Sequence, residues 1–360
     1  MALIDTILEI ARNKGASDIH IGTNRQPVIR LHGELACLTE EETFVDDSRK
    51  LLFSILTKEQ QDYFQKNFDL DFSYTAQDGT RYRGNLFYQH RGGVDGVFRV
   101  IPSAIPDISE LGLPAQILNF THLHQGLVLV TGPMGSGKTT TLAALTKFIN
   151  ETRSDHIITI EDPIEFLFQN EKAIINQREI QRHTTSYTSA LRAALREDPD
   201  IIIVGEMRDL DTISLALTAA ETGHLVFGTL HTTDAVSTVN RIIDVFPPGE
   251  QNKIRMMLAE SLNGVISQQL IPRKDGSGMV VASELLITTP ALSNLIRDNK
   301  TFHIPSIIQS GKAKHGMRLL DDSINDLLSQ EIITGKSAFA FAHDKNQFRS
   351  YLQEASNGKN

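Results

Sequence analysis

The chain has 360 residues, 40% of them hydrophobic and 22% charged, which suits two soluble globular domains rather than one. Its formal net charge of −9 argues against a protein that coats nucleic acid or an anionic membrane, because both attract basic surfaces. The single cysteine, Cys37, excludes a disulfide framework and a multi-cysteine zinc site, so we expect it to be a small buried residue in a reducing compartment.

The first hundred residues predict a small α+β domain. Apolar residues over 1–14 are spaced to fit one face of a helix that ends at Gly15. No apolar run reaches the ~20 residues that cross a bilayer, and the start of the chain does not resemble a signal peptide, so we expect a cytoplasmic protein. Residues 47–67 are also expected to be helical, and strands are expected at 18–21, 28–31, 34–38, 70–74, 82–89 and 96–100.

Residues 101–114 contain three prolines and show no clean periodicity. Proline fixes φ and removes a backbone donor, so we expect a stiff linker here, between one domain at 1–100 and another at 115–345. The polar end of the chain, 346–360, is expected to be a flexible tail.

Beyond the linker, apolar strands alternate with helices. Helices are expected at 139–150, 186–197 and 211–222, and strands at 127–131, 156–160, 201–204 and 225–230. Continuous apolar strands that alternate with helices indicate a parallel sheet covered on both faces. From residue 236 onward the pattern is mostly helical, with one hairpin around Asp275 and Gly276.

The strongest motif matches G-x-x-x-x-G-K-[ST] in full and consists of Gly132, Pro133, Met134, Gly135, Ser136, Gly137, Lys138 and Thr139. Its glycines allow backbone N–H groups to turn toward phosphate oxygens, and the helix that follows directs its positive end at the same place. We expect Lys138 to reach the β- and γ-phosphates of ATP and Thr139 to bind Mg²⁺, with Thr140 also part of the nucleotide site.

Hydrolysis also needs carboxylates that hold the metal shell and orient water. Glu206 follows the strand at 201–204, and α/β sheets bind ligands at the carboxyl ends of their strands. A glutamate here suits contact with the metal through a bound water. A second acidic group, Glu161, Asp162 and Glu165, follows the strand at 156–160. The residues alone leave open which of the three acts as the base, or whether the run is a solvated turn.

Two histidines flank the strand at 225–230. His231 comes directly after it, on the side where the phosphates are expected, so it could sense the γ-phosphate. His224 comes directly before the same strand. A lone histidine is usually structural, so both are candidates whose role depends on what lies beside them.

The segment around Glu206 resembles the secretion-superfamily (GspE-type) ATPases. Residues 195–209, Leu-Arg-Glu-Asp-Pro-Asp-Ile-Ile-Ile-Val-Gly-Glu-Met-Arg-Asp, fit that pattern position by position, as do the acidic box at 161–165 and the histidine box at 223–231. Within the superfamily the chain is similar to the PilT-type retraction ATPases of type IV pili, from Gly15 to about Leu328.

This resemblance implies a PAS-like N-terminal domain followed by a RecA-like ATPase domain. It also implies a ring of six subunits with ATP at the subunit interfaces. Arg81 and Arg83 match the arginines of the family's N-terminal domain that contact ATP. Alternate residues of a strand share one face, so both guanidinium groups could point at one phosphate; alternatively they form a basic face exposed to water.

The resemblance also assigns roles to the acidic and histidine residues. It makes Glu165 the catalytic glutamate, Glu206 the Walker B acid, and His224 and His231 the histidine pair. We expect Glu165 to orient water for in-line attack on Mg-ATP, and loss of the γ-phosphate to let the two domains rotate about the 101–114 linker.

Two absences favour retraction over pilus extension or secretion. The motors for those tasks usually carry a four-cysteine zinc insertion and an extra N-terminal domain, and this chain has neither the cysteines nor the length. Residues 291–298, Ala-Leu-Ser-Asn-Leu-Ile-Arg-Asp, resemble the A-I-R-N-L-I-R-E motif of the retraction family. They depart from it at Leu292, Ser293 and Asp298, and only Ser293 replaces a charged side chain.

The resemblance therefore predicts a homohexameric motor at the cytoplasmic base of a pilus machine, acting on an inner-membrane platform protein, with a second retraction ATPase as a further partner. One alternative is a diverged paralogue that drives another type IV pilus or a type II secretion-like platform. Another is a regulator that binds ATP without turning it over, which the full set of catalytic groups disfavours. The acidic charge and the absence of a basic, aromatic strip disfavour a nucleic-acid motor.

Overall fold

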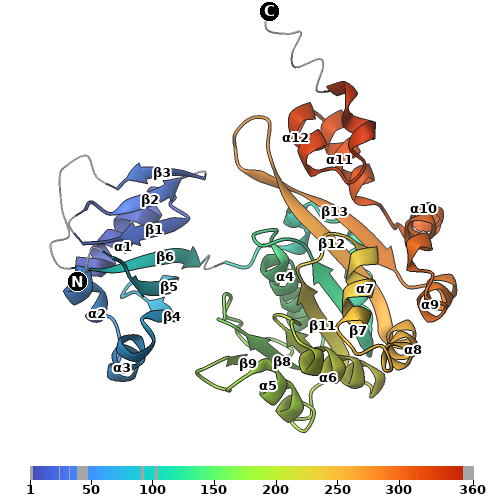
Figure 1. The fold of residues 1–360 in the computed structure, drawn as a ribbon, viewed down its shortest axis with the longest axis horizontal. Helices are drawn as coiled ribbons and strands as arrows, with labels where there is room; N and C mark the ends of the chain where they lie inside the picture. The colour runs from blue at the N-terminus through green and yellow to red at the C-terminus, as the bar shows by residue number, and fades with distance from the viewer. Residues whose placement is uncertain are drawn as a thin grey trace, which may run out of the picture. The chain divides into compact units, whose positions relative to one another are not determined.

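The computed structural model describes residues 3–23, 25–31, 33–38, 48–90, 93–101 and 104–351, which form two compact units (Figure 1). The first unit comprises residues 1–104 together with 163–167, and the second comprises 105–162 and 168–360. The division at 104/105 falls in the stretch expected to be a linker, of which Pro102 and Ser103 lie outside the described residues.

The first unit is built on a six-stranded antiparallel sheet with the strand order β3-β2-β1-β6-β5-β4. In β5 the buried residues Tyr82 and Leu86 alternate with half-buried Arg81 and Arg83, so the two arginines share a face of the strand. The strands are β1 (Asp18–Ile21), β2 (Val28–Leu31), β3 (Glu34–Cys37), β4 (Asp69–Thr75), β5 (Arg81–Tyr88) and β6 (Val94–Ile101).

Three helices pack on this sheet: α1 (Leu3–Asn13), α2 (Ser48–Phe53) and α3 (Lys58–Asn67). Ile4 and Leu8 of α1, spaced one turn apart, join Phe64 of α3 in the core of the unit. The helix expected over 47–67 is interrupted, because the Thr57 side chain accepts the backbone N–H of Gln60 and starts a new helix there.

Cys37 is exposed, so the expectation that it is buried is wrong. It lies on β3, which among the described residues is the edge strand of the sheet and pairs with β2 alone. All four residues of β3 are exposed. The residue type favours burial, but the position of the strand in the sheet decides it.

The second unit is built on a seven-stranded sheet with the order β13-β12-β7-β11-β10-β8-β9. Every neighbouring pair is parallel except β12 and β13, which form the expected hairpin. The strands are β7 (Gly126–Thr131), β8 (His156–Glu161), β9 (Ile174–Glu179), β10 (Ile201–Val204), β11 (Leu225–Leu230), β12 (Leu262–Pro272) and β13 (Met279–Ile287).

Helices cover both faces of this sheet, and alternate side chains of each strand point to opposite faces. Leu127 and Leu129 of β7 belong to one core, and Val128 and Val130 belong to the other. The second of these cores contains η1 (Ile108–Leu111), η2 (Ala115–His122) and α4 (Lys138–Thr152). The first contains α5 (Tyr187–Ala194), α6 (Leu210–Glu221), α7 (Ala235–Asp244), α8 (Gln251–Ser261), α9 (Pro290–Arg297) and α10 (Ile304–His315).

The remaining elements are η3 (Thr301–His303), α11 (Leu320–Ser329), α12 (Gly335–Phe341) and η4 (Lys345–Phe348). Phe348 is 1% exposed and packs in a small core with α11 and α12, so the stretch expected to be a tail at 346–360 begins inside a folded element. Residues 352–360 lie outside the described residues. Across the part of the chain that the structure describes, no helix combines the length and apolarity needed to span a membrane.

β9 was not expected from the sequence, and β12, whose last residues belong to the expected hairpin, begins earlier than expected. β9 follows a polar loop, and the sequence pattern does not separate the strand from that loop. β12 begins at Leu262, within a stretch expected to be helical, and pairs with β7 in parallel with Ser267 opposite Thr131. Its first residues mix apolar Leu262, Val265 and Ile266 with Asn263 and Gly264, and so short a pattern does not separate a strand from a helix.

Candidate active site

The P-loop motif forms the turn between β7 and α4. Gly132 and Gly137 adopt φ of +146° and +87°, a region that strains other residues. A β-carbon on Gly132 would also collide with the main-chain oxygen of Gln268 in β12. Glycine is therefore needed at Gly132 for two reasons, the backbone angle and the close approach of the neighbouring strand.

Lys138 is the first residue of α4 and is 9% exposed. Its ammonium group donates to the carbonyl oxygens of Gly132 (2.8 Å) and Pro133 (2.9 Å) and lies 3.4 Å from Nδ1 of His231. Thr139 and Thr140 follow in the first turn of the helix and are half-buried. The lysine head group is thus held over the start of the loop and beside the end of β11.

The parallel strands β7, β11, β10 and β8 end at one edge of the sheet. Leu230 of β11 is paired with Thr131 of β7, and Val204 of β10 is paired with Ile160 of β8. Residues that directly follow these strands must therefore emerge on the same side as the P-loop. Glu206 and His231 do so, and they contact each other there.

Glu206 accepts hydrogen bonds from two side chains. Oε1 lies 2.9 Å from Nε2 of His231 and is also paired with the guanidinium group of Arg208. Burial is the largest influence on the pKa of Glu206 and opposes ionisation, but the hydrogen bonds from Arg208 and His231 and the positive charge of Arg208 together outweigh it. The pKa of Glu206 is therefore lowered, and the group is a carboxylate at neutral pH.

The contacts of His231 define its tautomer. An ammonium group can only donate, so Nδ1 of His231 must accept from Lys138. Nε2 then carries the proton and donates it to Glu206. The result is a continuous chain of polar contacts from the P-loop lysine through a neutral imidazole to the carboxylate.

The acidic box divides between the two units. Glu161, the last residue of β8, accepts hydrogen bonds from Thr159 (2.6 Å) and Gln177 of β9 (3.2 Å). Asp162 lies near the half-buried phenol of Tyr187, whose pKa is raised by burial first and then by the charges of Asp162, Glu206 and Glu161. Glu161 is thus bound into the sheet, while Asp162 contributes negative charge to the edge that holds Glu206.

Glu165 lies in the loop 163–167, which belongs to the first unit. Its carbonyl oxygen and that of Ile164 accept hydrogen bonds from the Arg81 guanidinium group, at 3.4 and 2.8 Å. Arg83 shares the face of β5 with Arg81, is 40% exposed at its side chain and lies 4.0 Å from Asp71. The two arginines therefore have different surroundings: one holds the loop of Glu165, and the other faces solvent.

His224 does not join the other candidate residues of its own chain. It precedes β11, whereas His231 follows it, so the six residues of the strand separate them. The Nδ1 of His224 lies 3.1 Å from the carbonyl oxygen of Ala219, near the end of α6. His224 therefore lies beside the end of α6, at the opposite end of β11 from His231.

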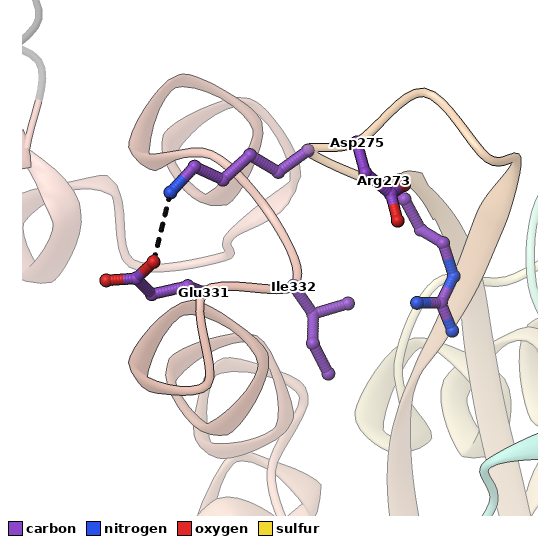
Figure 2. A pocket seen from close by; sticks show the side chains of 5 residues that line it. Arg273, Asp275, Glu331 and Ile332 are labelled. Atoms are coloured by element: carbon purple, nitrogen blue, oxygen red, sulfur yellow. Dashed lines mark hydrogen bonds and ion pairs between the residues drawn. The ribbon is translucent and has the colours of Figure 1, made fainter.

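A cavity of about 500 Å³ at the tip of the β12–β13 hairpin is a different feature (Figure 2). Its lining includes Lys274 and Glu331, which form an ion pair at 3.3 Å with side chains 53% and 80% exposed. Exposed pairs of this kind contribute little free energy, and none of the P-loop residues lines the cavity. We therefore place the candidate active site at the P-loop edge of the sheet.

Comparison with known proteins shows the family of the chain. The family model described as "Type II/IV secretion system protein" matches residues 1–279. The chain belongs to this family. It is 50% identical over 312 residues to a twitching motility protein of Neisseria gonorrhoeae, covering 87% of this chain and 83% of that protein.

A relative and a solved structure are similar to the chain over almost their whole length. The type IV pilus retraction ATPase PilT of Pseudomonas aeruginosa is 47% identical over 335 residues, which cover 93% of this chain and 96% of that protein. The crystal structure of the pilus retraction motor PilT with bound ADP matches with a TM-score of 0.88 at 44% identity, covering 96% of this chain and 98% of that one. The predicted fold class, a PAS-like α+β domain followed by a RecA-like ATPase domain, is confirmed.

Three residues at the candidate active site of this protein were not predicted from its sequence. Arg208 lies two positions after Glu206 and could have been noticed as a cation beside a candidate carboxylate. Tyr187 and Gln268 come from segments without a motif, and only the packing of α5 and β12 brings them to this edge. In the described part of the chain, no three His, Cys, Asp or Glu side chains converge as a metal-binding group.

Proposed function

We propose that this protein is an ATP-hydrolysing motor subunit that drives retraction of type IV pili. It belongs to a family of secretion ATPases, and its relatives are named for twitching motility and pilus retraction. A structurally similar retraction motor holds ADP. Within the structure, the network of Lys138, His231 and Glu206 carries the proposal, because it joins a phosphate-binding loop to an ionised carboxylate at the ends of adjacent strands.

The P-loop residues 132–140 bind the nucleotide in this proposal. Backbone N–H groups of the loop and the N-terminus of α4 bind phosphate oxygens, and the Lys138 ammonium group adds a positive charge. Its present acceptors, the carbonyls of Gly132 and Pro133, are weaker partners than a phosphate. A triphosphate would therefore draw the lysine away from the start of the loop.

Thr139 and Glu206 are the residues that would hold Mg²⁺. A hydroxyl and an ionised carboxylate are the hard oxygen ligands that this ion prefers, and it usually completes its shell with waters and phosphate oxygens. The lowered pKa of Glu206 fits such a role. Bound Mg²⁺ would neutralise charge on the phosphate oxygens.

We assign the orientation of the attacking water to Glu165, and the sensing of phosphate to His231. His231 links Lys138 to Glu206, so a change in the lysine position alters the hydrogen bond that the carboxylate receives. Arg81 and Arg83 are proposed to contact the nucleotide as the family pattern implies. Arg81 also contacts the main chain beside Glu165, so it can relay a change in that loop to β5.

The proposed assembly is a homohexamer at the cytoplasmic base of the pilus machine, with an inner-membrane platform protein and a second retraction ATPase as partners. In such a ring, residues such as His224 that lie away from the chain's own P-loop can serve a neighbouring subunit. Mass measurement with and without nucleotide tests the assembly. A monomer under both conditions at working concentration contradicts it.

The catalytic assignment is tested by Glu165→Gln, with Glu171→Gln as a matched change at an exposed position. We expect Glu165→Gln to abolish steady-state phosphate release and to leave ADP affinity within about threefold, since the amide keeps the shape but cannot orient water as a base. Unchanged turnover refutes the role of Glu165. Failure of the wild-type protein to release phosphate refutes the ATPase itself.

A diverged paralogue that drives another platform is the second candidate. It is favoured by Ser293 in α9, where the retraction motif has a charged residue. Leu292 and Ile296 form the buried side of this helix, whereas Asn294 and Arg297 are exposed. The departure therefore lies outside the buried face of α9. Twitching motility of a deletion strain that expresses this protein separates the two candidates.

A further inference from the structure

The side chain of Gln268 lies directly under the P-loop. It belongs to β12, which runs parallel to β7 with Ser267 opposite Thr131, so the next residue of β12 faces the loop that follows β7. Gln268 is 2% exposed. Its Nε2 donates to the carbonyl oxygen of Ser136 at 2.7 Å, and its Oε1 accepts from Oγ1 of Thr141 at 2.9 Å.

The chemistry of its partners defines the orientation of this amide. The Ser136 carbonyl can only accept, so the NH₂ end of Gln268 must face it. The hydroxyl of Thr141 then donates to the other end. One buried side chain therefore uses both ends to connect the fifth residue of the P-loop with the second turn of α4.

The bond to Ser136 has a consequence for phosphate binding. In a trans peptide the C=O and the following N–H point in opposite directions. Because the Ser136 carbonyl is directed at Gln268, the Gly137 N–H is directed away from β12. A loop that binds phosphate through its amides needs its N–H groups turned away from the sheet and toward the ligand.

The main chain of β12 holds the other end of the loop. A β-carbon at Gly132 would collide with the main-chain oxygen of Gln268, so the strand lies against the first residue of the loop. Gln268 thus contacts the loop at two places: its main-chain carbonyl lies against Gly132, and its side chain is hydrogen-bonded to Ser136. Exchange of this buried amide for an apolar group leaves the Ser136 carbonyl without that partner and frees the peptide to rotate.

We propose that Gln268 is a positioning residue of the active site, which sets nucleotide affinity by holding the Ser136–Gly137 peptide in the phosphate-binding orientation. This inference rests on the proposed function, because it requires that the loop bind nucleotide phosphates. Gln268 need not touch the nucleotide. It acts through the peptide that does.

The test compares Gln268→Met with Gln269→Met. Methionine keeps the length and volume of glutamine but makes no comparable hydrogen bond, and Gln269 is the half-buried neighbour that faces the other side of β12. By isothermal titration of the full chain with ADP, we expect Gln268→Met to bind about tenfold more weakly, the effect of one lost buried hydrogen bond. Gln269→Met should bind within about twofold of the wild type.

A second pair of variants acts on the other end of the amide. Thr141→Val removes the hydroxyl that holds Oε1 of Gln268, and Thr141→Ser keeps it. We expect Thr141→Val to weaken ADP binding a few-fold and Thr141→Ser to restore the wild-type affinity. This pair decides the matter if Gln268→Met does not fold.

A purely structural role for Gln268 predicts a lower melting temperature without nucleotide and an unchanged ADP affinity for the folded protein. That result overturns the inference, as does equal affinity of Thr141→Val and Thr141→Ser. Either of these results differs from a failure of the proposed function, because in that case the wild-type protein itself does not bind ADP.

Discussion

Glu284 offers a quantitative test of how the region behind the active site is held together. It lies on β13, is 4% exposed, and accepts the N–H of Ala235 at 2.7 Å, at the start of α7. It also accepts the N–H of Leu320 at the start of α11. One buried carboxylate therefore accepts hydrogen bonds from the first residues of two helices, α7 and α11. Of these, α7 begins four residues after His231.

Burial is the main reason that the pKa of Glu284 is raised from 4.5 to about 7. The hydrogen bond from Ala235 and that from Leu320 favour the ionised form, while the charges of Asp234 and Asp321 oppose it. The folded state therefore holds a proton that the unfolded state has released between these two pH values. The stability from this group is fully present below about pH 4.5 and is lost as the pH rises through about 7, by roughly 3 kcal/mol.

Glu284→Gln removes this titration and keeps the shape of the side chain. For a domain of about 250 residues, the loss of roughly 3 kcal/mol corresponds to about 6–12 °C in melting temperature. Between pH 4 and pH 8, a range that spans both pKa values, we expect the melting temperature of the wild-type protein to fall by that much more than that of the variant. Comparing the two proteins at each pH cancels the other titrating groups, and Glu260→Gln, an exposed site, is the matched control. If the wild type and Glu284→Gln show the same pH dependence, the buried carboxylate does not titrate as described.

Two further predictions concern the polar network at the strand ends. Arg208→Ala removes a cation that lowers the pKa of Glu206, so that pKa should rise and the acidic limb of the ATPase pH profile should move to higher pH. Phosphate release measured from pH 4 to 8 tests this, and an unmoved limb contradicts it. His231→Ala breaks the connection between Lys138 and Glu206, so kcat should fall about 10- to 100-fold, while ADP affinity measured by titration should change less than threefold. Equal losses in both quantities would indicate that His231 only supports the loop.

The local parts of the candidate site could be predicted from the amino-acid sequence. The P-loop could be recognised because its motif lies within eight consecutive residues and places glycines where the backbone needs a positive φ. Gly132 and Gly137 do adopt such angles. The strands that end beside Glu206 and His231 were also visible, since parallel strands buried on both faces appear as continuous apolar runs. These features depend on residues that are neighbours in the chain.

Contacts between segments that are distant in the chain could not be predicted in this way. Pairing of β12 with β7 brings Gln268 to Ser136, 132 residues earlier in the chain, and no periodicity in either segment encodes that partnership. Cys37 was expected to be buried, but β3 lies at the edge of its sheet and leaves it exposed. In the same way, the direction of β11 separates His224 from His231 by the length of the strand. Burial and contact follow from the order and direction of strands, which are set by the packing of the whole domain rather than by any short stretch of sequence.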